Sequence, residues 1–251
     1  MIITYLKNAR IGIATELGRP YYRFSRILKD LGMNFDSILP KDISYFDGDI
    51  ILTTEKEAPK NSVIPLLFDD ITDKDAQVIQ GLILQKIDHG LNDNQLLLGI
   101  DPGKQIGLSV YYLGNEISSS FFVSTEKLIQ KVISILAELK AKHKIIKIGN
   151  GDMQMANEIV KLLNLKFCSN FEIEFVDERN TSLKIKNFNQ RGKRDMLSAQ
   201  FITQRSGYWH SVLPLSITGW YIIKLVQLWK TYIFIDVSEV FFEIDHIFYI
   251  N

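Results

Sequence analysis

The sequence predicts an α/β protein, because apolar runs of strand length alternate with amphipathic helical patterns along most of the chain. The 251 residues are 46% hydrophobic and 23% charged, which is enough apolar material for a sizeable core. A single cysteine excludes a disulfide framework and a cysteine-based zinc site. We expect two domains, residues 1–90 and 96–210, joined by a polar linker at 91–95 and followed by an extension at 211–251.

The first domain is expected to be a small α/β unit, whose role the sequence does not indicate. Thr72, with Asp75 three residues later, is a capping-box-like pair that predicts the start of a helix. No glycine-rich phosphate loop follows a strand here, so no nucleotide chemistry is assigned. The expected strands are 10–15, 37–39, 49–53 and 63–68, and the expected helices are 21–31 and 73–86.

The second domain is expected to run strand, strand, strand, helix, strand, helix, strand, helix. Gly114-Asn115 is a good turn dipeptide for a hairpin between the second and third strands, and Ser124 or Thr125 caps the long helix that follows. The expected strands are 96–100, 107–113, 116–123, 144–149 and 171–176. The expected helices follow residue 124 and span 155–163 and 194–204.

The last 41 residues differ from the rest, because they hold nine of the 28 aromatic side chains and six charged ones. Residues 217–237 have the length of a membrane span, but Lys224 and Lys230 would each cost a few kcal/mol near the bilayer centre. We therefore favour a buried terminal element or an oligomer contact over a membrane partner, and an atypical terminus without a packed role is a third interpretation. The start of the chain lacks the pattern of a secretory signal, so a cytoplasmic location is expected.

Acidic residues stand where the predicted elements end or begin. Asp101 follows the apolar run 96–100, Glu178 follows the strand at 171–176, and Asp195 opens the last helix. Ligand sites of α/β sheets lie at the carboxyl ends of strands, so these acids can converge. Three carboxylates suit two hydrated Mg²⁺ or Mn²⁺ ions about 4 Å apart, which is the arrangement that hydrolyses phosphodiesters.

Three motifs that contain these acids resemble those of RNase H-like nucleases of the RuvC and YqgF branches, which include Holliday junction resolvases. Residues 99–110 (GIDPGKQIGLSV) resemble the first hairpin of that family. Residues 176–182 (VDERNTS) are similar to the DERLTS signature of the YqgF branch, with a departure at Asn180, and residues 194–199 (RDMLSA) resemble the terminal helix. The resemblance covers roughly residues 96–205, and it implies an RNase H-like mixed five-stranded sheet with flanking helices.

By this resemblance, Asp101, Glu178 and Asp195 are the catalytic, metal-binding acids, and Asp101 bridges both ions. RuvC-type resolvases carry a glutamate at the end of strand four, where this chain has Gly149-Asn150-Gly151-Asp152. In the expected sheet, strand five lies two strands from strand one, about 9–10 Å away, so Glu178 has far to reach. Asp152 therefore stays open as an alternative metal ligand.

Basic residues surround the predicted acidic site and favour a nucleic-acid substrate. The net charge of the whole chain is zero, but residues 96–210 carry 16 basic and 11 acidic side chains. A solvated polar loop is the alternative interpretation of the segment between Glu178 and Asp195. The residues predicted to contact nucleic acid are Lys104, Arg179, Lys184, Lys186, Arg191, Lys193 and Arg194.

A second basic run follows the long helix, and its positive charges are favourable beside the negative carboxyl end of the helix dipole. It consists of Lys140, Lys142, Lys144 and Lys147.

Taken together, the acids, the basic residues and the resemblance predict a Mg²⁺- or Mn²⁺-dependent nuclease, a hydrolase acting on structured DNA or RNA. The alternative is a catalytically inactive nucleic-acid-binding or scaffold protein with the same fold. A homodimer is expected from the resemblance, since paired cuts need two active sites.

Overall fold

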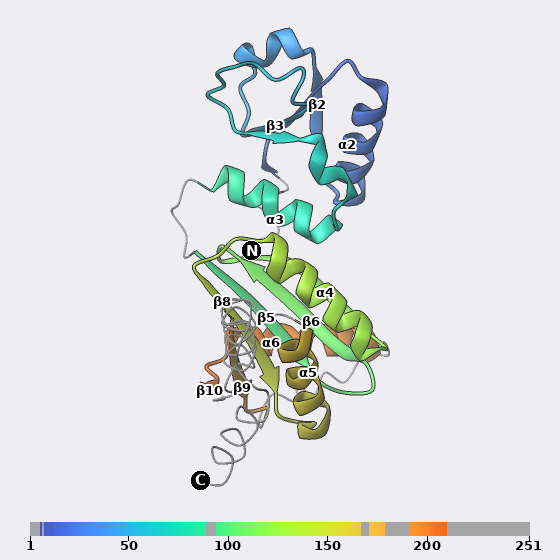
Figure 1. Cartoon of the computed structure of the whole chain (residues 1–251), viewed down its shortest axis with the longest axis vertical. Helices are drawn as coiled ribbons and strands as arrows, with labels where there is room; N and C mark the ends of the chain where they lie inside the picture. Colours follow the sequence, from blue (N-terminus) through green and yellow to red (C-terminus); the bar gives the residue numbers. More distant parts are fainter. Residues whose placement is uncertain (1–5, 7, 89–93, 167–170, 179–190, 210–251) are drawn as a thin grey trace, which may run out of the picture. The chain divides into compact units, whose positions relative to one another are not determined.

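The computed structural model describes residues 6, 8–88, 94–166, 171–178 and 191–209. Two β-sheets with flanking helices make up this part of the chain, so the predicted α/β class is confirmed. One sheet is parallel with four strands, and the other is mixed with six (Figure 1). The extension predicted at 211–251 and residues 91–93 of the linker predicted at 91–95 lie outside the described residues.

The four-stranded sheet has the order β2-β1-β3-β4, with every neighbouring pair parallel. Its strands are β1 (Ile11–Ala14), β2 (Phe35–Ile38), β3 (Ile50–Thr53) and β4 (Leu66–Phe68). Both central strands, β1 and β3, are buried along their whole length, as expected of a parallel sheet covered on both faces. The helix α2 (Gly18–Asp30) starts three residues before the predicted position, because Pro20 is compatible with a first helical turn.

Glu57 fills the carboxyl edge of this sheet between β1 and β3. Its carboxylate accepts hydrogen bonds from the hydroxyls of Thr15 and Thr54, and from the backbone N–H of Glu16 at 2.8 Å. Burial raises the pKa of Glu57, but the hydrogen bonds from these three partners outweigh it and lower the pKa below its ordinary value. The Glu57 carboxylate therefore links the loops that follow β1 and β3 at this edge of the sheet.

The helix α3 (Ala76–Ile87) begins at a cap other than the predicted one. Thr72 belongs to the short 3-10 helix Asp69–Asp73, and its hydroxyl donates to the carbonyl of Asp69 at 2.8 Å. Asp75 is the N-cap, and its side chain accepts from the N–H of Gln77 at 3.1 Å. The prediction of Thr72 as cap was wrong, because a 3-10 turn precedes the helix and uses that hydroxyl.

The six-stranded sheet has the order β10-β9-β8-β5-β6-β7. Strands β5, β8 and β9 run parallel, while β6, β7 and β10 are each antiparallel to a neighbour. Strand β9 lies two strands from β5, as predicted, with β8 between them. The bounds are β5 (Gln95–Asp101), β6 (Ile106–Tyr112), β7 (Asn115–Phe122), β8 (His143–Gly149), β9 (Glu172–Val176) and β10 (Tyr208–Trp209).

The hairpin between β6 and β7 turns one residue earlier than predicted. Tyr112 pairs with Asn115, so the loop is Leu113-Gly114, and both of these residues have positive φ, 50° and 74°. Positive φ at both central positions is the geometry of the type I′ turns that suit two-residue hairpins. The turn needs glycine only at its second position, and Leu113 adopts the left-handed conformation at the first.

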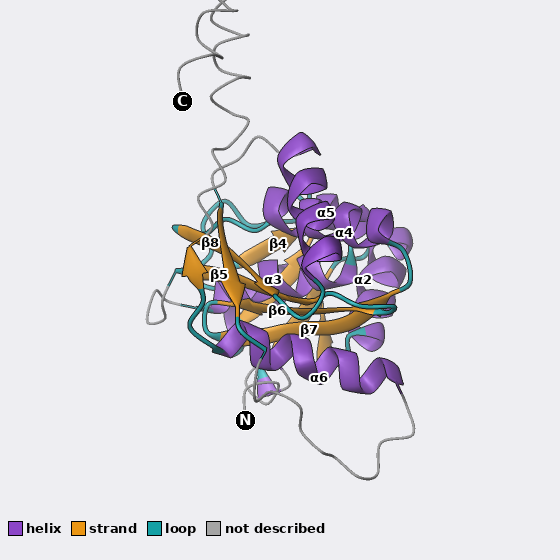
Figure 2. Ribbon diagram, turned by 90° about the horizontal axis from the view of Figure 1, so that it is seen from below, coloured by secondary structure: helices purple, strands orange, loops and turns teal. Residues whose placement is uncertain are grey.

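Helices cover both faces of the six-stranded sheet. Figure 2 shows α4 (Thr125–Glu138) and α5 (Met153–Lys166) on one face and α6 (Arg191–Gln204) on the other. Ser124 caps α4 by accepting from the N–H of Lys127, which settles the choice between Ser124 and Thr125. The buried face of α4 carries Leu128, Ile129, Val132, Ile135 and Leu136.

Glycines in three neighbouring strands let α6 lie directly on the sheet. A Cβ atom at Gly107 of β6 would lie 2.1 Å from the carbonyl oxygen of Asp195, and one at Gly99 of β5 would lie 2.4 Å from that of Ala199. A Cβ at Gly149 of β8 would lie 2.9 Å from Ile202. Atoms at these distances clash, so any larger residue would push α6 away from the strands.

Lysines of the second basic run contact helix ends. Lys144 donates to the carbonyl of Leu136 in the last turn of α4, which agrees with the helix-end interpretation. Lys147 donates to the carbonyl of Arg205, just after α6, at 2.6 Å, and lies 3.7 Å from the carboxylate of Glu174. Lys147 therefore fixes the carboxyl end of α6 to the sheet.

No helix among the described residues is long and apolar enough to cross a membrane.

Candidate functional site

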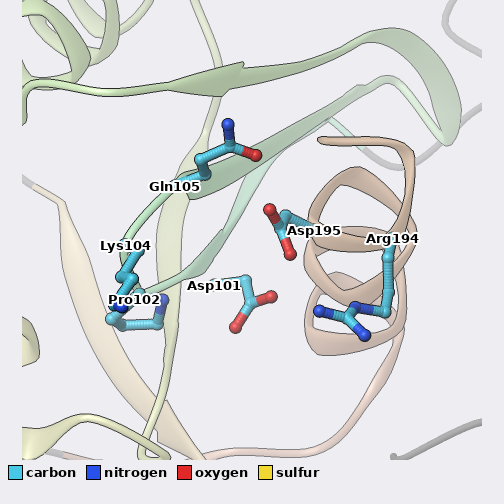
Figure 3. A pocket seen from close by; sticks show the side chains of 7 residues that line it. Asp101, Pro102, Lys104, Gln105, Arg194 and Asp195 are labelled. Carbon is cyan, nitrogen blue, oxygen red and sulfur yellow. The ribbon is translucent and has the colours of Figure 1, made fainter. Parts of the chain in front are cut away.

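Asp101 and Asp195 come together at the carboxyl end of β5. Asp101 is the last residue of β5, and Asp195 lies in the second turn of α6, because that helix starts at Arg191. Figure 3 shows their carboxylates pointing toward one another across a pocket. The pocket has a volume of about 540 Å³ and is lined by Asp101, Pro102, Gly103, Lys104, Gln105, Arg194 and Asp195.

The electrostatics of Asp101 show that the three predicted acids interact. Burial raises the pKa of Asp101, and the charges of Glu178 and Asp195 raise it further, to about 7. A hydrogen bond with Ser198 and the positive charge of Arg194 act in the opposite direction without compensating. Two carboxylates beside a partly buried third make a site of concentrated negative charge, which a cation would neutralise.

Glu178 reaches this site by lying over the end of β8. Its Oε1 accepts from the N–H of Gly151 at 3.0 Å, and its own N–H donates to Oδ1 of Asn150 at 3.1 Å. A Cβ atom would lie 1.8 Å from the Glu178 carboxylate at Gly149 and 2.5 Å from it at Gly151. The two glycines of this segment thus leave room for the glutamate to cross the strand that separates β9 from β5.

Asp152, the alternative ligand, has a structural role at the start of α5. Its Oδ1 accepts from the N–H of Met155 at 3.0 Å, and its carbonyl accepts from the N–H of Ala156 at 2.9 Å. These are the bonds of a helix N-cap. Asp152 is not among the charges that shift the pKa of Asp101, so Glu178 is the better placed third acid.

The side chains present have the chemistry to bind a hard divalent cation, although they are not arranged as a complete metal-coordination site. Within the described ranges, no three His, Cys, Asp or Glu side chains are arranged to hold a metal ion together. The donors are nevertheless carboxylate oxygens, which Mg²⁺ and Mn²⁺ prefer. The Oε1 atom of Gln105, beside the same pocket, is buried and has no hydrogen-bond partner among the described residues.

The predicted nucleic-acid-binding residues divide into placed and unplaced ones. Lys104 and Arg194 line the pocket, and Lys193 is exposed on the first turn of α6. Arg191 is the first residue of α6, but its side chain is not described. Arg179, Lys184 and Lys186 lie outside the described residues.

Sequence reasoning missed three residues of the site: Gln105, Ser198 and Gly107. Ser198 follows Asp195 by three positions in α6, and that spacing puts two side chains on one face of a helix. Gly107 was visible as a glycine inside a strand, which often marks a close backbone approach.

Comparison of the chain with models of known families and with curated proteins gives no match.

Proposed function

We propose that this chain is a metal-dependent endonuclease of the RNase H-like superfamily that hydrolyses phosphodiester bonds in structured DNA or RNA. The observation that carries the proposal is the site around Asp101, where burial and then the charges of Glu178 and Asp195 raise the pKa of the Asp101 carboxyl to about 7. Strand order supports it as well. The order β9-β8-β5-β6-β7, with β5, β8 and β9 parallel, agrees with the RNase H-like sheet expected from the sequence motifs.

The side chains of the site have separate roles in this proposal. Asp101, Asp195 and Glu178 would hold Mg²⁺ or Mn²⁺, with Asp101 in the shared position. When bound, these ions would supply an activated water and neutralise charge on the leaving oxygen. Lys104 and Arg194 would bind the phosphates on either side of the reacting one, since both side chains line the same pocket.

A catalytically inactive nucleic-acid-binding protein is the second candidate. The observation that favours it is the incomplete coordination site, because no three metal-binding side chains among the described residues are arranged around one point. In that case the basic side chains would bind the phosphate backbone of the nucleic acid, and the acids would catalyse no reaction. A homodimer belongs to the first candidate, in which paired cuts need two active sites.

A cleavage assay on four-way DNA junctions and folded RNA, with Mg²⁺, Mn²⁺ or EDTA, separates the two candidates. We expect cleavage with either metal and none with EDTA. Asp101→Asn should abolish cleavage, because it removes the shared ligand, while binding of the uncut substrate stays within a few-fold of wild type. If the wild-type protein binds these substrates and cuts none of them with either metal, the second candidate replaces the first.

A further inference from the structure

We propose that Gln105 is part of the metal site, and that its Oε1 accepts a hydrogen bond from a water molecule bound to the cation that Asp101 and Asp195 hold. This role rests on the proposed function, because it adds a neutral oxygen to the acids proposed to bind Mg²⁺ or Mn²⁺. The family resemblance gives the role of metal ligand to carboxylates alone. Gln105 is therefore an addition to the predicted set of site residues.

Gln105 reaches the pocket from the loop that joins β5 and β6. It directly precedes β6, and Asp101, at the other end of this loop, is the last residue of β5. Gln105, Asp101 and Asp195 all line the same pocket of about 540 Å³. Figure 3 shows the amide oxygen of Gln105 turned toward the helix that carries Asp195. The glutamine thus presents an oxygen on the side of the pocket where the two acids meet.

The amide oxygen of Gln105 is buried and accepts no hydrogen bond from any described residue. Lys104 and Arg194, the two basic side chains that line the pocket, do not donate to it either. A buried acceptor without a donor destabilises the folded state, because its hydrogen bonds to water are lost on folding. Ionised carboxylates accept hydrogen bonds and cannot donate them, so the neighbouring acids do not supply the donor. A ligand of the pocket that carries hydrogen-bond donors would satisfy this oxygen.

A hydrated divalent cation supplies both the donor and the positive charge that this pocket favours. Mg²⁺ keeps several of its water molecules when it binds to proteins through one or two carboxylates, and those water molecules can donate to a nearby acceptor. Asp101 and Asp195 would hold the ion, and Gln105 would orient one of its water molecules. This arrangement agrees with the finding that, in the part of the chain that the structure describes, no three His, Cys, Asp or Glu side chains surround one point.

The test measures the affinity of the full-length protein for Mn²⁺ alone, with MnCl₂ as the probe, no nucleic acid present, and the pH at 8. The electron paramagnetic resonance signal of the free ion gives the bound fraction. Gln105→Met keeps the length of the side chain without its oxygen. It should weaken Mn²⁺ binding by about 10- to 100-fold, the range for loss of a group that supports a metal ligand. Gln105→Glu keeps an oxygen acceptor and adds a negative charge, so it should bind Mn²⁺ at least as tightly as wild type.

Melting temperatures in EDTA separate a role in metal binding from a purely structural one. Gln105→Met should melt at or above the wild-type temperature, because it removes a buried oxygen that has no donor. Gln105→Glu should melt below wild type, because it places a further negative charge beside Asp101 and Asp195. Added Mn²⁺ should then raise the melting temperature of Gln105→Glu by more than that of wild type.

Gln200 provides a matched control on α6. Its Nε2 donates to the carboxylate of Glu116, and it is not among the residues that line the pocket. Gln200→Met should therefore melt below wild type in EDTA and bind Mn²⁺ with unchanged affinity. This is the opposite of the result expected for Gln105→Met.

The outcomes distinguish the role of Gln105 from the function on which it rests. If Gln105→Met binds Mn²⁺ as tightly as wild type while Asp101→Asn does not bind it, the role of Gln105 is wrong and the proposed metal site stands. If Gln105→Met melts below wild type in EDTA, as Gln200→Met should, the amide makes a bond within the protein and the role is equally wrong. Loss of Mn²⁺ binding in Gln105→Glu would also contradict it. If wild type binds neither Mn²⁺ nor Mg²⁺, both the role of Gln105 and the proposed function are wrong.

Discussion

Gly107 and Asp195 touch through their backbones, since a Cβ atom at Gly107 would lie 2.1 Å from the carbonyl oxygen of Asp195. Gly107 is also the strand partner of Asp101. The glycine thus brings the helix that carries one acid against the strand that carries the other. A site with two carboxylates in proximity depends here on a position that has no side chain.

Gly107→Ala should lower the free energy of unfolding by about 1–3 kcal/mol, the usual cost of inserting a methyl group into a packed contact. It should also reduce cleavage, because α6 and Asp195 must shift away from Asp101. Urea denaturation monitored by circular dichroism measures the first effect. Gly18→Ala is the control, since a Cβ at Gly18 meets no atom within 4 Å and should change stability little. Equal stability of both variants would contradict the close contact.

The choice between Glu178 and Asp152 as third acid can be made with two charge-removing substitutions that keep the local hydrogen bonds. Glu178→Gln retains an oxygen that accepts from Gly151, and Asp152→Asn retains a good helix N-cap. We expect Glu178→Gln to reduce Mg²⁺-dependent cleavage by about 100-fold, the upper end of the range for loss of a group that supports a metal, and Asp152→Asn to leave it within about three-fold. The reverse result would assign the metal to Asp152.

Asp101 should make the metal-free protein less stable as pH rises. Its pKa is about 7 in the folded protein against 3.8 as the ordinary value, so the folded state binds more protons between these pH values. Stability therefore falls as pH rises from about 4 to 7, and it stays reduced above pH 7. Asp101→Asn removes this penalty and should stabilise the metal-free protein by at most about 4 kcal/mol at pH 8 and little at pH 4.

Thermal denaturation in EDTA across this pH range measures the effect. Added Mg²⁺ should raise the melting temperature of wild type more at pH 8 than at pH 5, because the ion competes with protons for the same carboxylates. In the Asp101→Asn variant this pH-dependent response should be much weaker. If the Asp101→Asn variant is less stable than wild type at pH 8 in EDTA, repulsion among the acids does not destabilise the metal-free protein.

Glu57 gives the four-stranded sheet the opposite dependence on pH. Its pKa is lowered, so its hydrogen bonds stabilise the protein above the ordinary value of 4.5, and this contribution is lost as pH falls through the folded pKa. Glu57→Gln should cost about 1 kcal/mol at pH 7, since the site is partly solvated. Hydrogen exchange of the Glu16 amide, which donates to Glu57, should accelerate in the variant. Unchanged exchange would mean that this bond does not limit opening.

Periodicity predicted most strands and helices of the chain because their buried faces follow the 2.0 and 3.6 repeats. It placed β5 and β8 within a residue of their ends. The positions of Asp101 and Asp195 at the ends of predicted elements, together with the family resemblance, then singled out two acids that line one pocket. Cap and turn positions were less predictable. Thr72 and Asp75 have equal capping chemistry, and the 3-10 turn that decides between them depends on contacts beyond that segment.

Long-range packing was beyond reach of the sequence pattern. The role of Asp152 as a cap rather than a ligand follows from the exact start of α5, which was expected two residues later. The crossing of Glu178 over β8 follows from the small size of Gly149 and Gly151, whose meaning appears only when β9 is placed beside β8. Short polar motifs identify which side chains take part, but the distances between them depend on how α6 lies on the sheet.

The phase of α6 is fixed at both ends of the helix, by Gly107 beside Asp195 and by Lys147 at the carbonyl of Arg205. Each residue of an α-helix advances the side-chain direction by about 100°. One residue inserted between Asp195 and Arg205 would therefore rotate the Asp195 carboxylate by about 100° away from Asp101, or release the helix end from Lys147. The number of residues in this stretch of α6 is thus as much a part of the candidate site as the acids themselves.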